Sequence, residues 1–475
     1  MENLQKFYIN GQWVAPISKA TLPVLNPALN EQIGTVSMGN SDDVNKAVAA
    51  AKAAFAGYSQ TGKADRLALL KRLKEETEKR FEDMAQAMRM EMGAPITMAR
   101  DAHADAAIGH LNSFIEALEA LQERMDLSNG DVMLREAIGV CGLITPWNWP
   151  INQIALKVIP ALATGCTCVL KPSEHTPVSA IVYAEIIHSA GYPAGVFNLV
   201  NGDGPTVGSC LSRHRDIQMM SFTGSTRAGT AVTHDAAETV KRVTLELGGK
   251  SPNIVFADCE LEAMVTASVQ ECMFNTGQSC DAPTRLLVER SCYDEALKIV
   301  KIAAEAVTVG NPEKEGGHLG PLFDEIQFDR VQNMISVGIN EGANLIVGGL
   351  GKPEGYEKGW FVKPTIFADV SNDQRIAQEE IFGPVLVVIP FENEADAVRI
   401  ANDTPYGLAA YLQTGNSARA ERVAKQLRAG AVHINGGAVN YGTPFGGYLQ
   451  SGNGREGGMM GLEDYLETKT LHGVF

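Results

Sequence analysis

The segment GVCGLITPWNWP, residues 139–150, decides the fold of this chain. Its first half, Gly139–Ile144, is a short apolar run typical of a buried strand, and the prolines that follow end it in a rigid turn. Apolar runs of this kind then alternate with helical patterns, which predicts a parallel sheet with helices on both faces. The further strands expected are Thr167–Leu170, Val196–Val200, Ile217–Phe222 and Val243–Leu247, and the helices follow Thr176 and cover Thr226–Ala237.

A second α/β series follows Gly248 and Gly249, and we expect a domain boundary there. Ligands of parallel sheets usually bind at the carboxyl ends of the strands, so the site is expected near this boundary. The predicted helices are Leu261–Phe274, Tyr293–Ala306 and Asp324–Asn340, and the predicted strands are Thr284–Glu289, Pro364–Val370, Val385–Pro390 and Ala431–Ile434.

The N-terminal third is predicted to be mostly helical. Ser41 is expected to cap an Ala-rich helix, and near-helical apolar spacing predicts single helices over Ala64–Met92 and Thr97–Gln122. The polar turn Ser128–Asp131 predicts a hairpin. The segment Leu462–Leu471 resembles an edge strand that pairs with this hairpin, in the same chain or in a partner subunit.

Composition restricts the function. The chain has 475 residues, 45% of them hydrophobic and 20% charged, which fits a globular protein with a large core. Its net charge of -16 argues against nucleic acid and anionic membranes as partners. No apolar run is long enough to span a bilayer, and Met1–Asn10 lacks a signal-peptide layout, so we expect a cytoplasmic protein. The eight cysteines lack metal-ligand spacing and are expected to be reduced thiols without a metal.

Two segments are candidates for binding a nucleotide. Phe222–Gly229 is a strand end whose glycines let a ligand approach the backbone at a helix N-terminus, although a plain glycine-rich turn is the more common meaning. Lys171 and Glu174 also follow a strand and could bind two ribose hydroxyls, with the carboxylate disfavouring a 2′-phosphate. Taken alone, they could equally be a solvated loop pair.

Three further residues could carry chemistry. Asn148 is held between prolines and tryptophans, which suits a preorganised oxyanion donor, but the same turn could be an aromatic core turn. Cys280 follows a glycine-containing turn rather than lying within an element, so it could be a reactive thiol, although most lone cysteines are structural. Glu246 ends a strand and could be a general base, although such a residue is usually at the surface.

Seven short motifs, taken together and in this order, favour the functional interpretation of these residues over the structural one: PWNWP, KPSE, FTGST, ELGGKSP, FNTGQSC, EEIFGPV and PFGGYLQSGNGRE. Together they resemble the aldehyde dehydrogenase superfamily over nearly the whole chain. The resemblance implies an α/β fold with a Rossmann-like NAD domain at 1–120 and 138–247 and a catalytic domain at 248–448. It also implies a small β element for oligomerisation at 121–137 and 449–475, and assembly as a homodimer or homotetramer.

The resemblance also implies a mechanism. Cys280 attacks the aldehyde to give a thiohemiacetal, Asn148 stabilises the oxyanion, hydride passes to NAD, and Glu246 activates the water that hydrolyses the thioester. Lys171 counts both among the catalytic residues and, with Glu174, among the contacts to the adenosine ribose. The other implied cofactor contacts are Ile144, Thr145, Pro146, Trp147, Ser173, Gly204, Phe222, Thr223, Gly224, Ser225, Gly229, Leu247, Gly248, Glu380 and Phe382. Glu456 resembles a second carboxylate in the water path.

The substrate is less well defined. The pocket expected near the chemistry consists of Trp149, Gln153, Leu156, Ser279, Asp281, Val439 and Phe445. Without an arginine for a distal carboxylate, this set favours medium or long aliphatic, aromatic or oxo-acid aldehydes. The alternatives are a semialdehyde dehydrogenase that uses NADP, for which Arg227 leaves room, and a cysteine esterase or structural protein on the same scaffold. Asp281, beside the thiol, departs from many relatives and is expected to face substrate or solvent.

Overall fold

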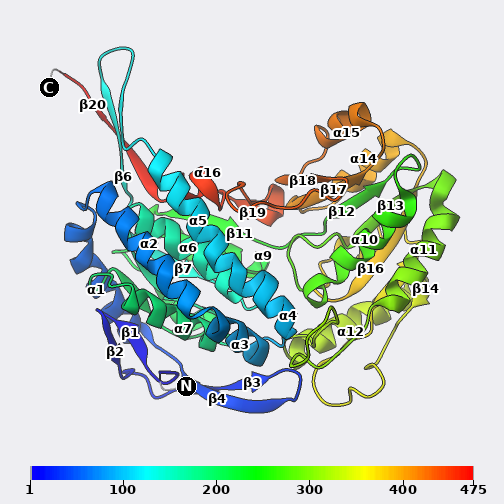
Figure 1. Cartoon of the computed structure of the whole chain (residues 1–475), viewed down its shortest axis with the longest axis horizontal. Helices are drawn as coiled ribbons and strands as arrows, with labels where there is room; N and C mark the ends of the chain where they lie inside the picture. The colour runs from blue at the N-terminus through cyan, green and yellow to red at the C-terminus, as the bar shows by residue number, and fades with distance from the viewer. Residues whose placement is uncertain (1–2, 474–475) are drawn as a thin grey trace.

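The computed structural model describes residues 3–473, which form two α/β units side by side and a projecting hairpin (Figure 1). The first unit contains an eight-stranded sheet in the order β19-β11-β10-β7-β8-β9-β1-β2. The five strands from β11 to β9 are parallel, as predicted, and antiparallel strands flank them. The strands are β1 (Phe7–Ile9), β2 (Gln12–Val14), β7 (Val140–Ile144), β8 (Thr167–Lys171), β9 (Phe197–Leu199), β10 (Met219–Thr223), β11 (Arg242–Glu246) and β19 (Gly452–Asn453).

Alternating side chains bury both faces of this sheet. Cys141 and Leu143 of β7 pack into one apolar cluster, whereas Val140 and Ile144 pack into the cluster on the opposite face. Strands buried on both faces read as continuous apolar runs, which is why residues 140–144 carry no polar side chain. The covering helices are α1 (Ser41–Tyr58), α2 (Lys63–Lys79), α3 (Phe81–Glu91), α5 (Asp105–Ala120), α6 (Pro150–Ala163), α7 (Pro177–Ser189), α8 (Ser209–Arg213) and α9 (Thr226–Ala236).

The second unit contains a seven-stranded sheet in the order β14-β15-β16-β13-β12-β17-β18. All neighbours are parallel except β14 and β15. The strands are β12 (Pro252–Val255), β13 (Arg285–Glu289), β14 (Asn344–Val347), β15 (Thr365–Ala368), β16 (Val385–Phe391), β17 (Ala409–Gln413) and β18 (Ala431–Ile434). The helices are α10 (Leu261–Met273), α11 (Tyr293–Ala306), α12 (Glu325–Asn340), α13 (Arg375–Gln378), α14 (Glu394–Asn402) and α15 (Ser417–Ala424). The predicted series lacked β12, β14 and β17.

The N-terminal helices differ from the prediction at three points. Asn40, not Ser41, caps α1, because its side chain accepts from the backbone N–H groups of Asp42 and Asp43. The single helix predicted over 64–92 is broken at Arg80, whose φ of -106° and ψ of 17° separate α2 from α3. The helix predicted over 97–122 begins as the short α4 (Ile96–Met98) and a π-helical segment before α5. The apolar spacing continues across each break, so spacing alone did not reveal them.

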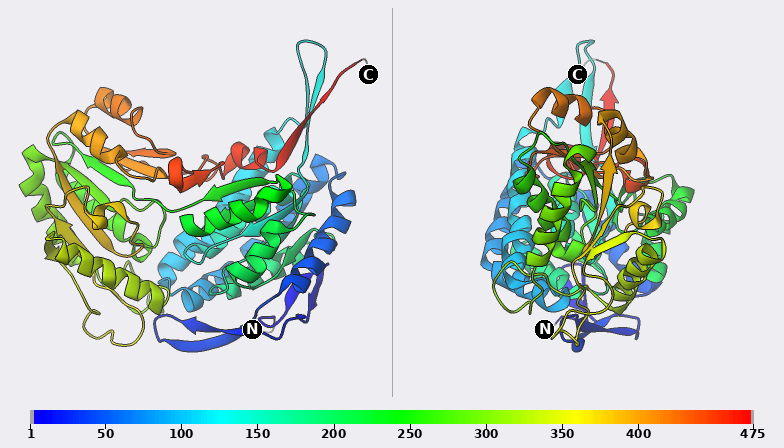
Figure 2. Two further views of the ribbon diagram at one scale, coloured as in Figure 1. Left: turned by 180° about the vertical axis from the view of Figure 1, so that it is seen from behind. Right: turned by 90° about the vertical axis from the view of Figure 1, so that its right-hand side faces the viewer.

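A three-stranded sheet projects from the first unit (Figure 1, Figure 2). It consists of β5 (Arg124–Asp126), β6 (Val132–Ala137) and β20 (Leu466–Leu471), and β20 pairs with β6 of the same chain from Leu466↔Ala137 to Leu471↔Val132. The strand thus begins four residues later than predicted, because α16 (Gly458–Glu463) precedes it. A further hairpin, β3 (Thr21–Asn26) and β4 (Glu31–Ser37), lies along the N-terminal edge (Figure 2).

Candidate active site

A cavity of about 150 Å³ lies where the two units meet, at the carboxyl ends of β7, β10 and β11. Parallel sheets place their ligand sites at this edge. The first unit contributes Pro146, Trp147, Asn148, Gln153, Thr223, Gly224, Ser225, Glu246, Leu247 and Gly248. The second unit contributes Cys280, Gln327, Arg330, Glu380 and Phe382. Residues predicted for catalysis, cofactor and substrate therefore share one cavity.

Cys280 is presented by a strained turn between α10 and β13. Asn275 and Thr276 have φ angles of 52° and 57°, in the left-handed region that side chains rarely adopt. Gly277 is required at the next position, because a Cβ there would lie 2.1 Å from the carbonyl oxygen of Gly383. The turn is thus fixed against the strand that follows Gly383, which sets the position of the thiol.

Asn148 is locked to the same turn. Its Nδ2 donates to the carbonyl of Gln278 at 3.0 Å, and Asn275 Nδ2 donates to the carbonyl of Asn148 at 2.9 Å. The neighbouring Trp149 donates from Nε1 to Ser279 Oγ at 2.9 Å. These bonds join the turn after β7 to the thiol loop, so the amide is preorganised beside Cys280, as an oxyanion donor requires.

Glu246 ends β11 and is 5% exposed. Neither carboxylate oxygen has a hydrogen-bond partner among residues 3–473. Burial first, and the Glu456 carboxylate second, raise the pKa of Glu246 well above its usual value. A carboxyl group with a raised pKa and free oxygens is suited to exchange a proton with water, which is the property a general base needs near neutral pH.

Glu456 is paired with the buried ammonium of Lys157, which also donates to Ser221 Oγ at 3.2 Å. Lys157 is 0% exposed, so this carboxylate is the charged partner of a fully buried side chain. Gly446 closes the other side of the Glu246 carboxyl group, since a Cβ there would lie 2.6 Å from Oε1. The carboxyl group is therefore enclosed by segments that lie some two hundred positions away in the chain.

The surroundings of Cys280 disfavour its thiolate form. Burial raises its pKa well above the usual value, and the carboxylates of Asp281, Glu380 and Glu246 raise it further. Asp281 therefore affects the thiol through its charge, although its side chain lines a different cavity. A neutral thiol is a weak nucleophile, so a nucleophilic role for Cys280 would require removal of its proton.

The predicted ribose contacts form a pair at the end of β8. Lys171 Nζ donates to Glu174 Oε2 at 3.1 Å, to the carbonyl of Gly202 at 2.6 Å and to the carbonyl of Pro172 at 2.9 Å. Burial would raise the pKa of Glu174, but the Lys171 ammonium brings it below its usual value. Glu174 is therefore a charged acceptor.

Glu380 is oriented by its backbone surroundings. Its Oε1 accepts from the N–H of Gly249 at 3.0 Å, and a Cβ on Gly248 would lie 2.5 Å from the other oxygen. Arg330 donates to the carbonyl of Glu380 at 2.6 Å. Gln327 donates to the carbonyl of Phe382 at 2.7 Å, and Phe382 has a φ of 63°. Arg330 and Gln327 were missed, because no motif marks one face of α12.

Several predicted residues lie outside this cavity. For the cofactor these are Ile144, Thr145, Lys171, Ser173, Glu174, Gly204, Phe222 and Gly229, and for the substrate they are Trp149, Leu156, Ser279, Asp281, Val439 and Phe445. Asp281 and Val439 instead line a second cavity of about 280 Å³. Trp149 stacks on His103, with ring centroids 4.2 Å apart, so it forms an aromatic wall next to the thiol loop.

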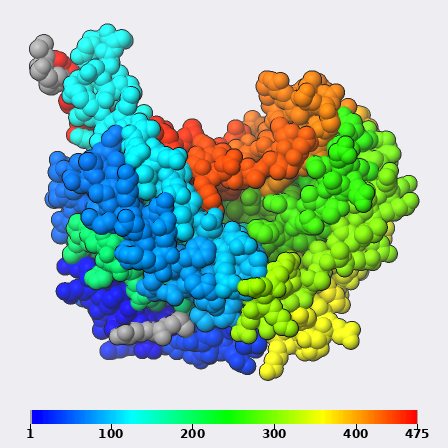
Figure 3. Space-filling model, in the orientation of Figure 1, coloured from blue at the N-terminus to red at the C-terminus, as the bar shows by residue number. Residues whose placement is uncertain are grey.

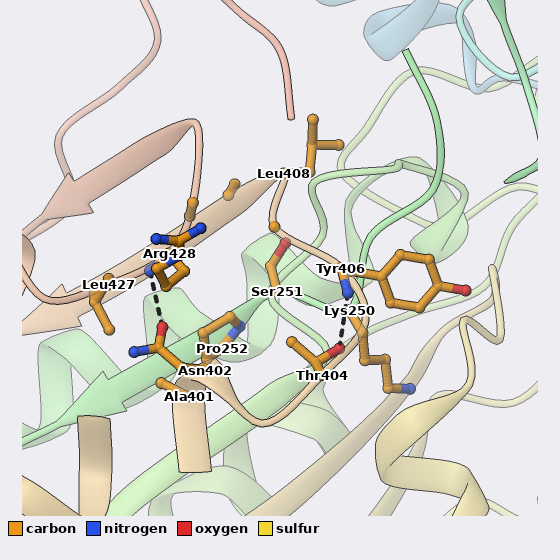
Figure 4. Close-up of a pocket in the computed structure, with 14 residues that line it drawn as sticks. Lys250, Ser251, Pro252, Ala401, Asn402, Thr404, Tyr406, Leu408, Leu427 and Arg428 are labelled. Atoms are coloured by element: carbon orange, nitrogen blue, oxygen red, sulfur yellow. Dashed lines mark hydrogen bonds between the residues drawn. The ribbon is translucent and has the colours of Figure 1, made fainter. Parts of the chain in front are cut away.

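Lys250 lies just beyond the glycine pair and is 1% exposed. Its ammonium nitrogen has no hydrogen-bond partner in the part of the chain that the structure describes, and burial, with the nearby Arg285 guanidinium, lowers its pKa to about 7. Figure 4 shows Lys250 and Tyr406 on one side of a small pocket and Leu427 and Arg428 on the other. Lys250 is thus a further group with a strongly shifted pKa, next to the glycine pair that borders the site.

Residues 13–471 match the model of the aldehyde dehydrogenase family. The chain belongs to the aldehyde dehydrogenase family. It is 50% identical to the 3-succinoylsemialdehyde-pyridine dehydrogenase of a Pseudomonas species, covering 100% of this chain and 99% of that protein. Among solved structures, aldehyde dehydrogenase from Bartonella henselae has a TM-score of 0.98 and 48% identity, covering 99% of each chain.

A mutant of aldehyde dehydrogenase C from Pseudomonas syringae, complexed with NAD+ and octanal, also has a TM-score of 0.98. It is 49% identical, covering 99% of this chain and 96% of that one. The expected fold and enzyme class are confirmed: the chain is an oxidoreductase of the aldehyde dehydrogenase family. No helix within residues 3–473 combines the length and apolar character needed to cross a membrane.

Proposed function

We propose that this aldehyde dehydrogenase oxidises medium or long aliphatic, aromatic or oxo-acid aldehydes with NAD through a covalent adduct on Cys280. The observation that carries the proposal is that Cys280, Asn148 and Glu246 line one cavity together with Glu380 and the end of β10. The octanal held by the Pseudomonas syringae relative supports the aliphatic class. The cysteine esterase and structural alternatives lose support, because neither requires this joint arrangement.

Each residue has a defined task in this mechanism. The Cys280 sulfur, once deprotonated, adds to the carbonyl carbon, and the Asn148 amide stabilises the oxygen that becomes negative. A nicotinamide dinucleotide bound beside Glu380 and the end of β10 would supply the hydride acceptor, and loss of hydride from that carbon would leave a thioester on Cys280. Glu246 then takes a proton from water, whose oxygen attacks the thioester and releases the acid and the free thiol.

The residues present fit a nicotinamide dinucleotide. The buried hydroxyl of Thr223 has no hydrogen-bond partner among the described residues, and Gly248 leaves free the space that a Cβ would fill against Glu380. Ser225 caps α9, whose N-terminus attracts phosphate. Glu174 favours NAD over NADP, because a carboxylate repels a 2′-phosphate. Glu174→Gln should therefore raise kcat/KM for NADP relative to that for NAD.

The decisive experiment follows NADH absorbance with octanal, benzaldehyde and a semialdehyde, for the wild type and for Cys280→Ala. We expect NADH formation by the wild type and a loss of at least about a thousandfold in the variant. Mass spectrometry during turnover should find the acyl group on Cys280. Full activity of Cys280→Ala would refute the mechanism, and a preference for the semialdehyde with NADP would favour the alternative substrate class.

We further propose that the chain assembles as a homodimer or homotetramer. β20 and β18 are the outer strands of their sheets, and each offers unpaired backbone groups. The molecule is concave between the projecting hairpin and α15, which leaves room for a second copy (Figure 3). Thr468→Pro in β20 removes a backbone donor, so light scattering should detect a smaller assembly than for the wild type. An unchanged mass would contradict this interface.

A cytoplasmic location stays a prediction.

A further inference from the structure

The second cavity, of about 280 Å³, lies between α10, β17, β18 and the loop 436–439. We call it the acceptor cavity, defined by Asp281, Glu271, Gln413, His433, Tyr411 and Val439. It lies next to the thiol loop, because the Tyr411 hydroxyl donates to the backbone carbonyl of Asp281, the residue after Cys280, at 3.2 Å. Burial, with the charges of Asp281 and Glu271, raises the pKa of Tyr411 well above its usual value.

The amide of Gln413 leaves a buried acceptor unused. Its Nε2 donates to Asn253 Oδ1 at 3.1 Å, and Asn253 Nδ2 donates to Ser268 Oγ at 2.7 Å, which itself donates to the carbonyl of Met264. One N–H of each amide is thus used within this chain of hydrogen bonds. Gln413 is 5% exposed, and its Oε1 has no partner within residues 3–473. A buried acceptor without a donor destabilises the empty cavity, and a ligand with an N–H group would offset that cost.

His433 presents a second acceptor. Its Nδ1 lies 2.8 Å from the carbonyl oxygen of Gly437, and because a carbonyl can only accept, Nδ1 carries the proton. In the neutral ring Nε2 is then an acceptor, and it has no partner in the described part of the chain. Tyr411 stacks on this ring at 4.5 Å and donates its own hydroxyl to the backbone carbonyl of Asp281 at 3.2 Å. The Tyr411 hydroxyl proton is therefore already used and is not available to a ligand.

Two carboxyl groups, Asp281 and Glu271, line the cavity. Burial raises the pKa of both, and the Asp281 carboxylate raises that of Glu271 further, so a bound cation would favour their charged forms. None of the described residues that line the cavity is Lys or Arg. No group of three or more His, Cys, Asp or Glu within residues 3–473 is arranged to hold a metal ion. The complement of such a wall is an organic cation with several N–H donors.

We propose that the acceptor cavity binds an ammonium group at the far end of the substrate, so that the preferred aldehydes of this enzyme carry a distal amino group. The inference rests on the proposed reaction at Cys280 and deepens it by naming a substrate class. The ammonium donates to Asp281, Glu271 and Gln413, while Tyr411 and Val439 pack against the adjoining carbons. For an aldehyde bound in this way to react, its carbonyl end must extend past Asp281 to Cys280, the neighbouring residue in the chain.

The test compares two aldehydes of nearly equal shape, para-(aminomethyl)benzaldehyde and para-ethylbenzaldehyde, and the corresponding meta pair. In each pair an ammonium replaces a methyl group, and the ring prevents the amine from closing on its own aldehyde. The measured quantity is the ratio of kcat/KM for the amino compound to that for the ethyl compound. Because both rates come from the same preparation, this ratio is independent of how much of a variant folds.

We expect the wild type to favour the amino compound in at least one pair. Asp281→Asn and Glu271→Gln should each lower the ratio about tenfold, whereas Glu262→Gln, on the exposed face of the same helix, should leave it unchanged. A wild-type ratio of one or less in both pairs, or a ratio that survives both cavity variants, overturns the proposal. If neither ethyl compound nor octanal is oxidised, the proposed function itself fails, so the two failures are distinguishable.

Discussion

Replacing Gly248 with Ala tests how the cofactor is held. A Cβ at this position would lie 2.5 Å and 2.7 Å from the two carboxylate oxygens of Glu380. The backbone of Gly248 lies outside the left-handed region, so alanine can adopt it without strain. The substitution therefore acts through the displaced carboxylate alone.

The size of the effect follows from this contact. Ordinary van der Waals contact begins at 3.4 Å, so the carboxylate must retreat by about 0.9 Å, which breaks its 3.0 Å bond to the N–H of Gly249. If Glu380 binds a ribose hydroxyl of NAD, the same retreat removes one charge-assisted hydrogen bond. Such a bond contributes about 1.5–3 kcal/mol, which corresponds to about 10- to 150-fold weaker binding.

The assay is a fluorescence titration with NADH, which gives the dissociation constant without turnover. The control is Gly57→Ala in α1, where an added Cβ meets nothing within 4 Å. The control should bind NADH as the wild type does, and Gly248→Ala should bind it at least about tenfold more weakly. An affinity within twofold of the wild type, with an unchanged Tm, would refute the placement of Glu380 at the cofactor.

Three further substitutions probe other parts of the molecule. Lys250→Met should stabilise the fold by about 3 kcal/mol more at pH 6 than at pH 9. The folded-state pKa of Lys250 is about 7, so the free-energy cost of burying its charge is complete below pH 7 and absent above the usual pKa of 10.5. Equal gains at the two pH values in denaturant titrations would contradict this. Glu456→Gln should shift the acid limb of the pH–rate profile for thioester hydrolysis to lower pH, because it removes the charge that is the second-largest cause, next to burial, of the raised pKa of Glu246. Stopped-flow measurement of acyl-enzyme decay gives this profile, and an unchanged acid limb would contradict the prediction. Gly109→Ala should lower the free energy of unfolding by about 1–3 kcal/mol, because its Cβ would lie 2.2 Å from the ring of Tyr441. If that contact is the cause, the double variant Gly109→Ala/Tyr441→Ala should recover most of the lost stability.

The sequence predicted the first sheet well because its strands are buried on both faces. An apolar run such as residues 140–144 has few other possible structures between turn signals. The prediction from sequence was wrong at Arg80 and Asn40, where the start or end of a helix depends on a single residue and its side-chain contacts. Apolar periodicity records which face is buried, but it does not record a change of helix axis.

The candidate site shows the same division. Motifs at strand ends identified Cys280, Asn148 and Glu246, since chemistry there requires particular residue types in rigid turns. The sequence could not place Arg330, which lies on a helix and acts through one backbone carbonyl. Nor could it show that Asp281 faces a separate cavity, because that depends on how β17 and β18 pack beside the thiol loop.

The pairing of β19 with β11 has a consequence for biosynthesis. Gly452 lies opposite Glu246 in that pairing, and Glu456 is the partner of the buried Lys157. The ribosome makes these residues some two hundred positions after Glu246. A nascent chain that already contains Cys280 and Asn148 therefore still lacks one wall of the pocket around Glu246. Under the proposed mechanism, the polypeptide can hydrolyse a thioester only after this late segment has docked.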